Sequence, residues 1–267
     1  MSMLSKVTPW NAVAEGYAST SVGVFRGYSE AALDLLAIEE GQQVLDNACG
    51  PGTLALAAAE LGARVDAVDF SPNMLAQLEA QLALHPKSEI TAICADGQSL
   101  PFEDERFDAA FSMFGLMFFP DRARGYAEMR RTLKPRGRIC ISSWARLENS
   151  PLLELMWTTL QAINPDIPDP QYDTQSLENP ELLTADLEGA GFGQVEIHTV
   201  RKAVSFESAQ GLWETMARGS APVVMMKAAL EPDAWRACEA KAIAHIQAAT
   251  ASTSRLEAEA YLGIAIK

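Results

Sequence analysis

The residues best suited to bind a ligand lie close together in the segment of residues 44–70. An apolar run that ends at Asp46 leads into a turn containing Gly50 and Gly52, and the next apolar run ends at Asp69. Glycine lets a ligand approach the backbone where a side chain would collide, and a carboxylate at the end of the second strand can accept hydrogen bonds from both hydroxyls of a ribose. The spacing predicts a site for an adenosine-type ligand.

Two classes of adenosine ligand fit this segment. Residues 50–55, GPGTLA, satisfy the permissive GxGxxG/A pattern of a dinucleotide site. Asp46 argues against a dinucleotide, because its carboxylate would repel the pyrophosphate, whereas it would attract a ligand that carries an ammonium and a sulfonium group. Further along the chain, Asp96 can accept a hydrogen bond from an adenine amino group, and Gly97 leaves room for the base. These residues favour the cationic ligand.

A parallel sheet would bring these residues to one edge. In the first 145 residues, apolar runs typical of buried strands alternate with helical patterns, which is the rhythm of βαβ units. Beyond Arg146, helical patterns predominate. The predicted strands are residues 44–46, 64–69, 89–96, 107–114, 138–144, 194–200 and 259–266. The predicted helices are residues 53–61, a helix after Pro72, 121–133, 152–162, a helix after Pro180, 208–218 and 232–249.

Composition restricts the possible partners. The chain has 267 residues, with 21 Lys and Arg against 35 Asp and Glu, so its formal charge is −14. A surface of this charge should repel polyanions, and we expect neither nucleic acid nor a membrane as a partner. The apolar runs are too short for a bilayer span and no signal-peptide pattern begins the chain, which predicts a cytoplasmic protein. The four cysteines have the spacing of neither a metal site nor a disulfide framework, so no metal is expected.

Five segments between about residues 40 and 145 occur in the order of a known family. They are VLDNACGPGT, VDAVDFSPNML, CADGQSLPF, FDAAFSMFGLMFFPD and LKPRGRICISSW. In this order they resemble the class I S-adenosylmethionine-dependent methyltransferases, in the small-molecule branch that includes enzymes of ubiquinone and menaquinone biosynthesis. The resemblance implies an α/β fold, a Rossmann-like three-layer sandwich whose seven-stranded, mostly parallel sheet has an antiparallel last strand, with helical cap segments. It also implies S-adenosylmethionine as the cofactor.

The resemblance assigns roles along the motifs. The first motif lies along the methionine part of the cofactor, Asp69 binds the ribose, and Asp96 binds the adenine amino group. The amino-terminal WNAVAEGY resembles a segment that folds over the cofactor. The implied cofactor contacts are Trp10, Tyr17, Asp46, Ala48, Cys49, Gly50, Gly52, Asp69, Phe70, Met74, Asp96, Gly97 and Ser112.

The expected chemistry is transfer of a methyl group to a small molecule. The predicted strand at residues 107–114 opens into an apolar, aromatic loop, so we expect Phe114 and Met117 to contact the acceptor. Displacement at a sulfonium needs alignment and exclusion of water more than a strong acid or base, and no catalytic residue is assigned. No Asn/Asp-Pro-Pro-aromatic motif follows this strand, which disfavours nucleic-acid and protein-amide acceptors. Methylation of oxygen or carbon is favoured.

Two alternatives stay open at this point. One is an NAD-dependent oxidoreductase, which the glycine pattern permits and Asp46 disfavours. The other is a protein that binds the cofactor without turning it over. One departure from the family concerns the turn LKPRGR, where Arg136 replaces the usual glycine, so we expect Gly137 to adopt the positive φ.

We expect a single methyltransferase domain over residues 1–267. Its parts are named by their predicted roles. The expected division is residues 1–40 as helices covering the cofactor, 41–146 as the cofactor-binding core, 147–178 and 201–255 as helical substrate or cap segments, and 256–267 as the last strand.

Overall fold

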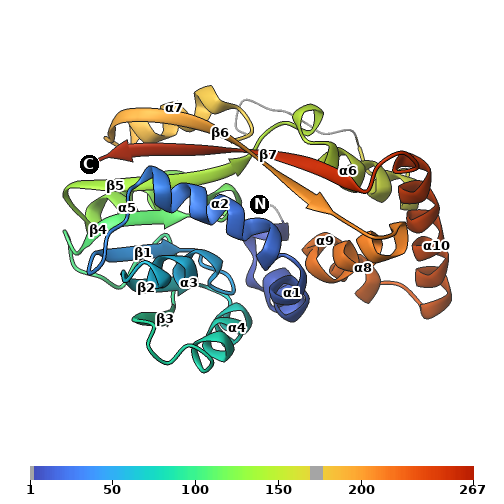
Figure 1. Cartoon of the computed structure of the whole chain (residues 1–267), viewed down its shortest axis with the longest axis horizontal. Coiled ribbons are helices and arrows are strands. Elements are labelled where there is room, and N and C mark those ends of the chain that lie inside the picture. Colours follow the sequence, from blue (N-terminus) through green and yellow to red (C-terminus); the bar gives the residue numbers. More distant parts are fainter. Residues whose placement is uncertain (1–2, 169–176) are drawn as a thin grey trace.

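The structure, a computed structural model, describes residues 3–168 and 177–267. A seven-stranded sheet has the strand order β3-β2-β1-β4-β5-β7-β6 (Figure 1). The strands are β1 (Gln43–Asn47), β2 (Arg64–Asp69), β3 (Ile90–Cys94), β4 (Phe107–Ser112), β5 (Leu133–Trp144), β6 (Gly193–Ser205) and β7 (Arg255–Ile266). The helices are α1 (Val7–Thr20), α2 (Val22–Leu35), α3 (Thr53–Glu60), α4 (Pro72–Leu82), α5 (Arg122–Thr132), α6 (Pro151–Ile163), α7 (Pro180–Gly189), α8 (Ala209–Gly219), α9 (Ala221–Ala228) and α10 (Pro232–Ala249).

All strands except the last share one direction. The pairs β1–β2, β1–β4, β2–β3 and β4–β5 are parallel. β7 pairs antiparallel with both β5 and β6, so β6 runs in the same direction as the first five strands. The predicted sheet, mostly parallel with an antiparallel last strand, is confirmed.

Alternate side chains of the central strands enter two separate apolar layers. In β1, Val44 packs in a layer with α2, α3 and α4, whereas the next residue, Leu45, packs with α5 and α7 on the other face. This period of two is that of a strand, and burial of both faces is typical of a parallel sheet. The predicted Rossmann-like sandwich with three layers is therefore confirmed.

A helical cap extends the sandwich at one end. β6 and β7 stay paired as far as Ser205 opposite Arg255, and α6, α8, α9 and α10 gather around this end of the two strands (Figure 1). α1 packs against α4 of the core and against α8 and α9 of the cap, so it bridges the two parts. The buried side chains of the cap include Leu152, Leu155, Ile163, Leu212, Trp213, Met216, Trp235 and Ile246.

Some element boundaries differ from the predicted ones. The predicted strands at residues 194–200 and 259–266 are both longer, because β6 and β7 continue to pair beyond β5. Residues 201–205, expected in the cap, therefore belong to β6. α9, which follows the predicted helix at residues 208–218, was not predicted. Residues 169–176 of the expected cap segment lie outside the described residues.

The turn near the start of β5 corrects one expectation. Arg136 has a φ of +66°, and Gly137 is not in the left-handed region, so the predicted positive φ at Gly137 is wrong. Gly137 is needed for another reason, because a Cβ there would lie 2.9 Å from the carbonyl oxygen of Lys134. The left-handed conformation costs a residue with a Cβ about 1 kcal/mol.

Replacing Arg136 with glycine is expected to stabilise the protein. Its side chain is exposed, so relief of the left-handed backbone is the main effect, and the free energy of unfolding should rise by up to about 1 kcal/mol. Urea denaturation measures this change. The matched control is Arg138→Gly in the extended part of β5, which should lower stability. Destabilisation by Arg136→Gly would contradict the assigned backbone conformation.

Candidate cofactor and acceptor site

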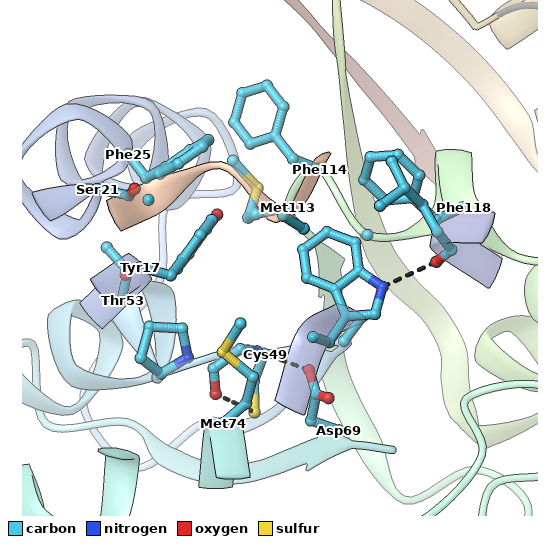
Figure 2. Close-up of a pocket in the computed structure, with 18 of the residues that line it drawn as sticks. Tyr17, Ser21, Phe25, Cys49, Thr53, Asp69, Met74, Met113, Phe114 and Phe118 are labelled. Atoms are coloured by element: carbon cyan, nitrogen blue, oxygen red, sulfur yellow. Dashed lines mark hydrogen bonds between the residues drawn. The ribbon is translucent and has the colours of Figure 1, made fainter. Parts of the chain in front are cut away.

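A cavity of about 500 Å³ opens at the carboxyl ends of β1 and β4. The strand order reverses between these two strands, and ligands of open α/β sheets bind at such a point. Its walls come from α1, the glycine loop after β1, the segment that follows β4, and the cap helices α6 and α8. Figure 2 shows Tyr17, Cys49 and Phe114 around this space. Segments far apart in the sequence therefore build one site.

The glycine loop after β1 forms one wall with its backbone. Ala48 and Gly50 both have positive φ, +64° and +54°, and both line the cavity. A Cβ on Gly50 would meet no atom within 4 Å, so this backbone faces open space. Gly52 does not line the cavity: its φ is +83°, and a Cβ there would lie 2.4 Å from the Leu78 side chain of α4. Gly50 thus offers its backbone to a ligand, and Gly52 lets the loop pack on α4.

Asp69, at the end of β2, holds the loop to the next helix. Its Oδ2 accepts a hydrogen bond from the Gly50 backbone N–H at 2.8 Å, and its Oδ1 accepts one from the Ser71 N–H at 2.8 Å. Burial raises the pKa of Asp69 to about 6, although these hydrogen bonds act in the opposite direction. The carboxylate lines the cavity, where a polar ligand can reach it.

Asp46 is a second buried carboxylate in the same wall. Its Oδ2 accepts a hydrogen bond from the Ala55 N–H, in the first turn of α3, at 3.2 Å. Burial raises the pKa of Asp46 to about 7, and the charge of Asp69 adds to this rise. Two carboxylates kept from water favour a ligand that supplies cationic or hydroxyl groups. These two carboxylates, as hydrogen-bond acceptors and negative charges, fit the ammonium, sulfonium and ribose hydroxyls of S-adenosylmethionine.

Cys49 also lines the cavity, between these two carboxylates in sequence. Burial, together with the charges of Asp46 and Asp69, raises the pKa of the Cys49 thiol well above its ordinary value. A thiol of this kind stays protonated and is a poor nucleophile. Cys49 therefore contributes shape to the wall.

The predicted adenine end of the site follows β3. Asp96 and Gly97 both line the cavity. The Asn47 side chain donates a hydrogen bond to the Gly97 carbonyl at 3.2 Å, and a Cβ on Gly97 would lie 2.3 Å from Asn47 Oδ1. Sequence reasoning missed Asn47; the signal was a polar residue directly after the carboxylate of a buried strand. Asn47 fixes the distance between the loops that follow β1 and β3.

Trp10 and Tyr17, the predicted covers, both line the cavity, as do Phe70 and Met74. The Trp10 ring packs against Phe118 with centroids 5.2 Å apart, and its indole N–H donates to the Leu4 carbonyl at 2.8 Å. Figure 2 shows Tyr17 opposite Met113 across the cavity.

The other end of the cavity is an aromatic wall, formed by Phe25, Phe114 and Trp144. The ring centroids of Phe114 and Trp144 are 4.2 Å apart, and that of Phe25 is 5.1 Å from Phe114. Phe114 has a φ of +56°, and its N–H donates to Ser142 Oγ at 2.8 Å. This backbone turns the ring into the cavity. Sequence reasoning missed Phe25, because α2 carries no motif.

The remaining side chains of this aromatic end of the cavity come from the cap. They are apolar and aliphatic, and their sequence segments carried no functional signal. Those that line the cavity include Leu152, Leu153, Met156, Val204, Leu212 and Met216.

Three predicted contacts, Gly52, Ser112 and Met117, lie outside the cavity lining. Ser112, at the end of β4, is fully buried beneath it, and its hydroxyl has no hydrogen-bond partner among the described residues. Met117 packs against the apolar layer of α5 and α7 and against the buried side chains of Tyr28, Phe114 and Ala260. The predicted acceptor pair is therefore divided, with Phe114 in the wall and Met117 behind it.

Within residues 3–168 and 177–267, no group of His, Cys, Asp and Glu has the arrangement of a metal site. None of the helices in these ranges has the length and apolar character needed to cross a membrane.

The fold and the cavity together define the class of protein. A parallel sheet, a glycine loop after β1, a carboxylate at the end of β2 and a cavity at the strand-order reversal are features of α/β proteins that bind nucleoside-containing cofactors.

Comparison with known proteins gives the family. The model described as "Methyltransferase domain" matches residues 45–141. A demethylmenaquinone methyltransferase of Clavibacter sepedonicus is 34% identical over 58% of this chain and 67% of that protein. A 2-phytyl-1,4-naphtoquinone methyltransferase of Trichormus variabilis is 39% identical over 48% of this chain and 58% of that protein. The chain belongs to the S-adenosylmethionine-dependent methyltransferases, and S-adenosylmethionine is its cofactor.

Solved structures agree on the fold. The YcgJ protein of Bacillus subtilis superposes with a TM-score of 0.58 at 14% identity, over 90% of this chain and 97% of that one. A phosphoethanolamine N-methyltransferase of Haemonchus contortus, solved with S-adenosyl-L-methionine, superposes with a TM-score of 0.56 at 21% identity. The superposition covers 90% of this chain and 52% of that one. Membership of the family decides against the NAD-dependent oxidoreductase.

The raised pKa values of Asp46 and Asp69 should make the ligand-free protein less stable as the pH rises. In the unfolded chain both groups lose their protons near pH 4. In the folded chain Asp69 keeps its proton to about pH 6 and Asp46 to about pH 7. Between these limits the folded state binds more protons, so its stability falls with increasing pH. We expect urea denaturation to show a lower free energy of unfolding at about pH 7.5 than at about pH 5.

Asp46→Asn is the matched control for this pH dependence. Its amide oxygen can still accept the hydrogen bond from Ala55, but the side chain stays neutral at every pH. The fall in stability should be smaller than in the wild type. Equal falls in both proteins would show that Asp46 does not contribute.

Asp69→Ala is expected to weaken cofactor binding about 10- to 100-fold, because hydrogen bonds to a buried carboxylate are lost. Titration calorimetry with S-adenosylmethionine and S-adenosylhomocysteine measures this change. Asp66→Ala is the matched control on the same strand, since Asp66 pairs with Arg106 and does not line the cavity. NADH should not bind to any of these proteins. Unchanged affinity in Asp69→Ala would remove Asp69 from the site.

Proposed function

We propose that this methyltransferase acts on a small, neutral aromatic acceptor, which it methylates on an oxygen or a carbon atom. One observation carries the proposal: a single cavity joins an end lined by three carboxylates to an end lined by aromatic and aliphatic side chains. The carboxylate end suits the cofactor, and the apolar end suits the acceptor.

The cofactor is assigned to the carboxylate end. Asp46 faces its cationic part, Asp69 its ribose, and Asp96 its adenine, with Gly50 and Gly97 offering backbone and space. Gly52 and Ser112 support the loop and strand from behind. The other proposed contacts are Trp10, Tyr17, Ala48, Cys49, Phe70 and Met74, all of which line the cavity.

The apolar end supports an acceptor without charge. Among the described residues, the cavity lining includes Asp46, Asp69 and Asp96 but no Lys, Arg, His or Glu. A phosphate or carboxylate on the acceptor would lack a cationic partner there, and burial of an unpaired charge is costly. A flat ring, in contrast, can pack against Phe114 and Trp144.

The reaction depends on alignment. The cofactor supplies a methyl group bound to a positively charged sulfonium. The chain holds the two ligands at opposite ends of one cavity, and its aromatic wall excludes water from the space between them. A hydroxyl acceptor must also lose its proton as it is methylated. No Lys, Arg or His lines the described cavity, so this proton would pass to bulk water at the cavity entrance.

The curated relatives suggest a first acceptor to test. Two of them are named for demethylmenaquinone and for a 1,4-naphthoquinone. A fused two-ring system of this class would match the aromatic wall in shape and polarity. We therefore propose a reduced 1,4-naphthoquinone as the representative acceptor, with residues 147–178 and 201–255 selecting its substituents.

The proposal includes a cytoplasmic location and no nucleic-acid partner. The four cysteines are free thiols, as is usual in a reducing compartment. The formal charge of −14 opposes binding to a polyanion.

An acceptor screen tests the proposed function. The protein is incubated with S-adenosylmethionine carrying a labelled methyl group and with 1,4-naphthohydroquinone, 1-naphthol, phosphoethanolamine, RNA or a protein mixture. The labelled methyl group should enter the naphthalene compounds, and excess S-adenosylhomocysteine should abolish this incorporation. Label only in phosphoethanolamine, RNA or protein would overturn the proposal. Tight cofactor binding without transfer to any of these acceptors would favour a protein that binds the cofactor without turnover.

A further inference from the structure

One hydroxyl group stands at the boundary between the two ends of the cavity. Tyr17 stacks on Phe25 of the aromatic wall, with ring centroids 5.5 Å apart. Its phenol also interacts electrostatically with the Asp69 carboxylate at the cofactor end. Figure 2 shows the hydroxyl directed into the cavity on the side of Met113 and away from Thr53. No described residue forms a hydrogen bond with it.

The Tyr17 hydroxyl is a hydrogen-bond donor at neutral pH. Burial, with a smaller contribution from the charge of Asp69, raises the pKa of Tyr17 well above its ordinary value of 10. The phenol therefore keeps its proton at neutral pH and does not act as a base there. An apolar cavity wall with one protonated, unpartnered hydroxyl favours a ligand that supplies a hydrogen-bond acceptor at that point.

The position of Tyr17 is fixed from both sides of α1. On the core side, Asn11 Oδ1 accepts a hydrogen bond from Ser71 Oγ at 2.7 Å, and Asn73 donates to the Asn11 carbonyl at 3.0 Å. On the cap side, a Cβ on Gly16 would lie 2.1 Å from the Arg218 carbonyl oxygen, so α1 and the end of α8 are in close contact. The helix cannot shift without breaking one of these contacts.

The next hydroxyl groups on the same face of α1 are already engaged. Thr20 Oγ1 donates to the Gly16 carbonyl of its own helix at 2.7 Å. Ser21 Oγ lies 3.5 Å from Thr20 Oγ1. Tyr17 is therefore the donor on this face that a ligand can satisfy without breaking an existing hydrogen bond.

We propose that the Tyr17 hydroxyl donates a hydrogen bond to an oxygen atom of the acceptor and so orients the acceptor ring between the cofactor and the wall of Phe25, Phe114 and Trp144. This inference rests on the proposed function. It narrows the acceptor class to aromatic rings that carry a hydroxyl or carbonyl oxygen. An unsubstituted ring would leave the Tyr17 hydroxyl buried without a partner, which costs binding free energy.

A binding experiment tests this without requiring turnover. 1-Naphthol and naphthalene have the same ring system and differ by one hydroxyl group. Each is titrated into protein saturated with S-adenosylhomocysteine, with tryptophan fluorescence as the signal, because Trp144 lines the acceptor end. The quantity measured is the ratio of the two dissociation constants, in the wild type, in Tyr17→Phe and in Tyr126→Phe.

The expected result is a preference for 1-naphthol that depends on Tyr17. The ratio should fall by about 3- to 10-fold in Tyr17→Phe, which keeps the ring and removes one hydrogen bond. Tyr126→Phe is the matched control, since Tyr126 is also a buried tyrosine whose hydroxyl has no described partner, but it lies on α5 outside the cavity lining. Its ratio should equal that of the wild type.

The contrary results are distinguishable. If both compounds bind but the ratio is the same in wild type and Tyr17→Phe, the acceptor end is apolar as proposed and the role of Tyr17 is wrong. An unchanged ratio with weaker S-adenosylhomocysteine binding in Tyr17→Phe would assign the hydroxyl to the cofactor instead. If neither compound binds the wild type, the proposed aromatic acceptor fails, and the inference about Tyr17 fails with it.

Discussion

The Asp69 carboxylate is the contact on which the cofactor end of the site depends. Its two oxygens accept hydrogen bonds from Gly50 and Ser71, so one side chain joins the end of β2, the glycine loop after β1 and the start of α4. The loop can then keep Ala48 and Gly50 in the left-handed region, where the backbone lines the cavity. Burial of this carboxylate beside Asp46 is unfavourable in the ligand-free chain and favourable once a cationic ligand with hydroxyl groups is present.

The acceptor end depends on a different constraint, the length of β6 and β7. These strands pair beyond the edge of β5 and provide the base on which the cap packs. Within the cap, the Trp213 and Trp235 rings stack with centroids 5.9 Å apart. α1 then connects cap and core, so the cavity closes between two parts that fold around separate apolar clusters. The proposed cofactor and acceptor ends thereby share one enclosed space.

The division of charge within this space explains how a methyltransferase can work without a charged side chain at its acceptor end. The carboxylates lie where the positive part of the cofactor is expected. Around the acceptor, the aromatic wall contributes exclusion of water and alignment, which are the main requirements of an in-line displacement. Phe114 illustrates the arrangement: its left-handed backbone, held by Ser142, places the ring in the wall.

Local sequence by itself determined the framework and the cofactor end. Alternation of strands and helices predicted the parallel sheet, and Asp46, Asp69 and Asp96 were identifiable because each lies at or just after the carboxyl end of a predicted strand. In a parallel sheet these ends meet at the same edge. Tertiary structure alone decided the acceptor end, since Phe25, Trp144 and Met216 come from three distant elements and become neighbours only after packing.

Tertiary structure also decided local details that depend on contacts. Phe114 and Met117 share one apolar loop, yet the turn after β4 sends one ring into the cavity and the other side chain into the layer behind. Arg136, not Gly137, adopts the left-handed backbone, and Gly137 is needed there because a Cβ would collide with the Lys134 carbonyl.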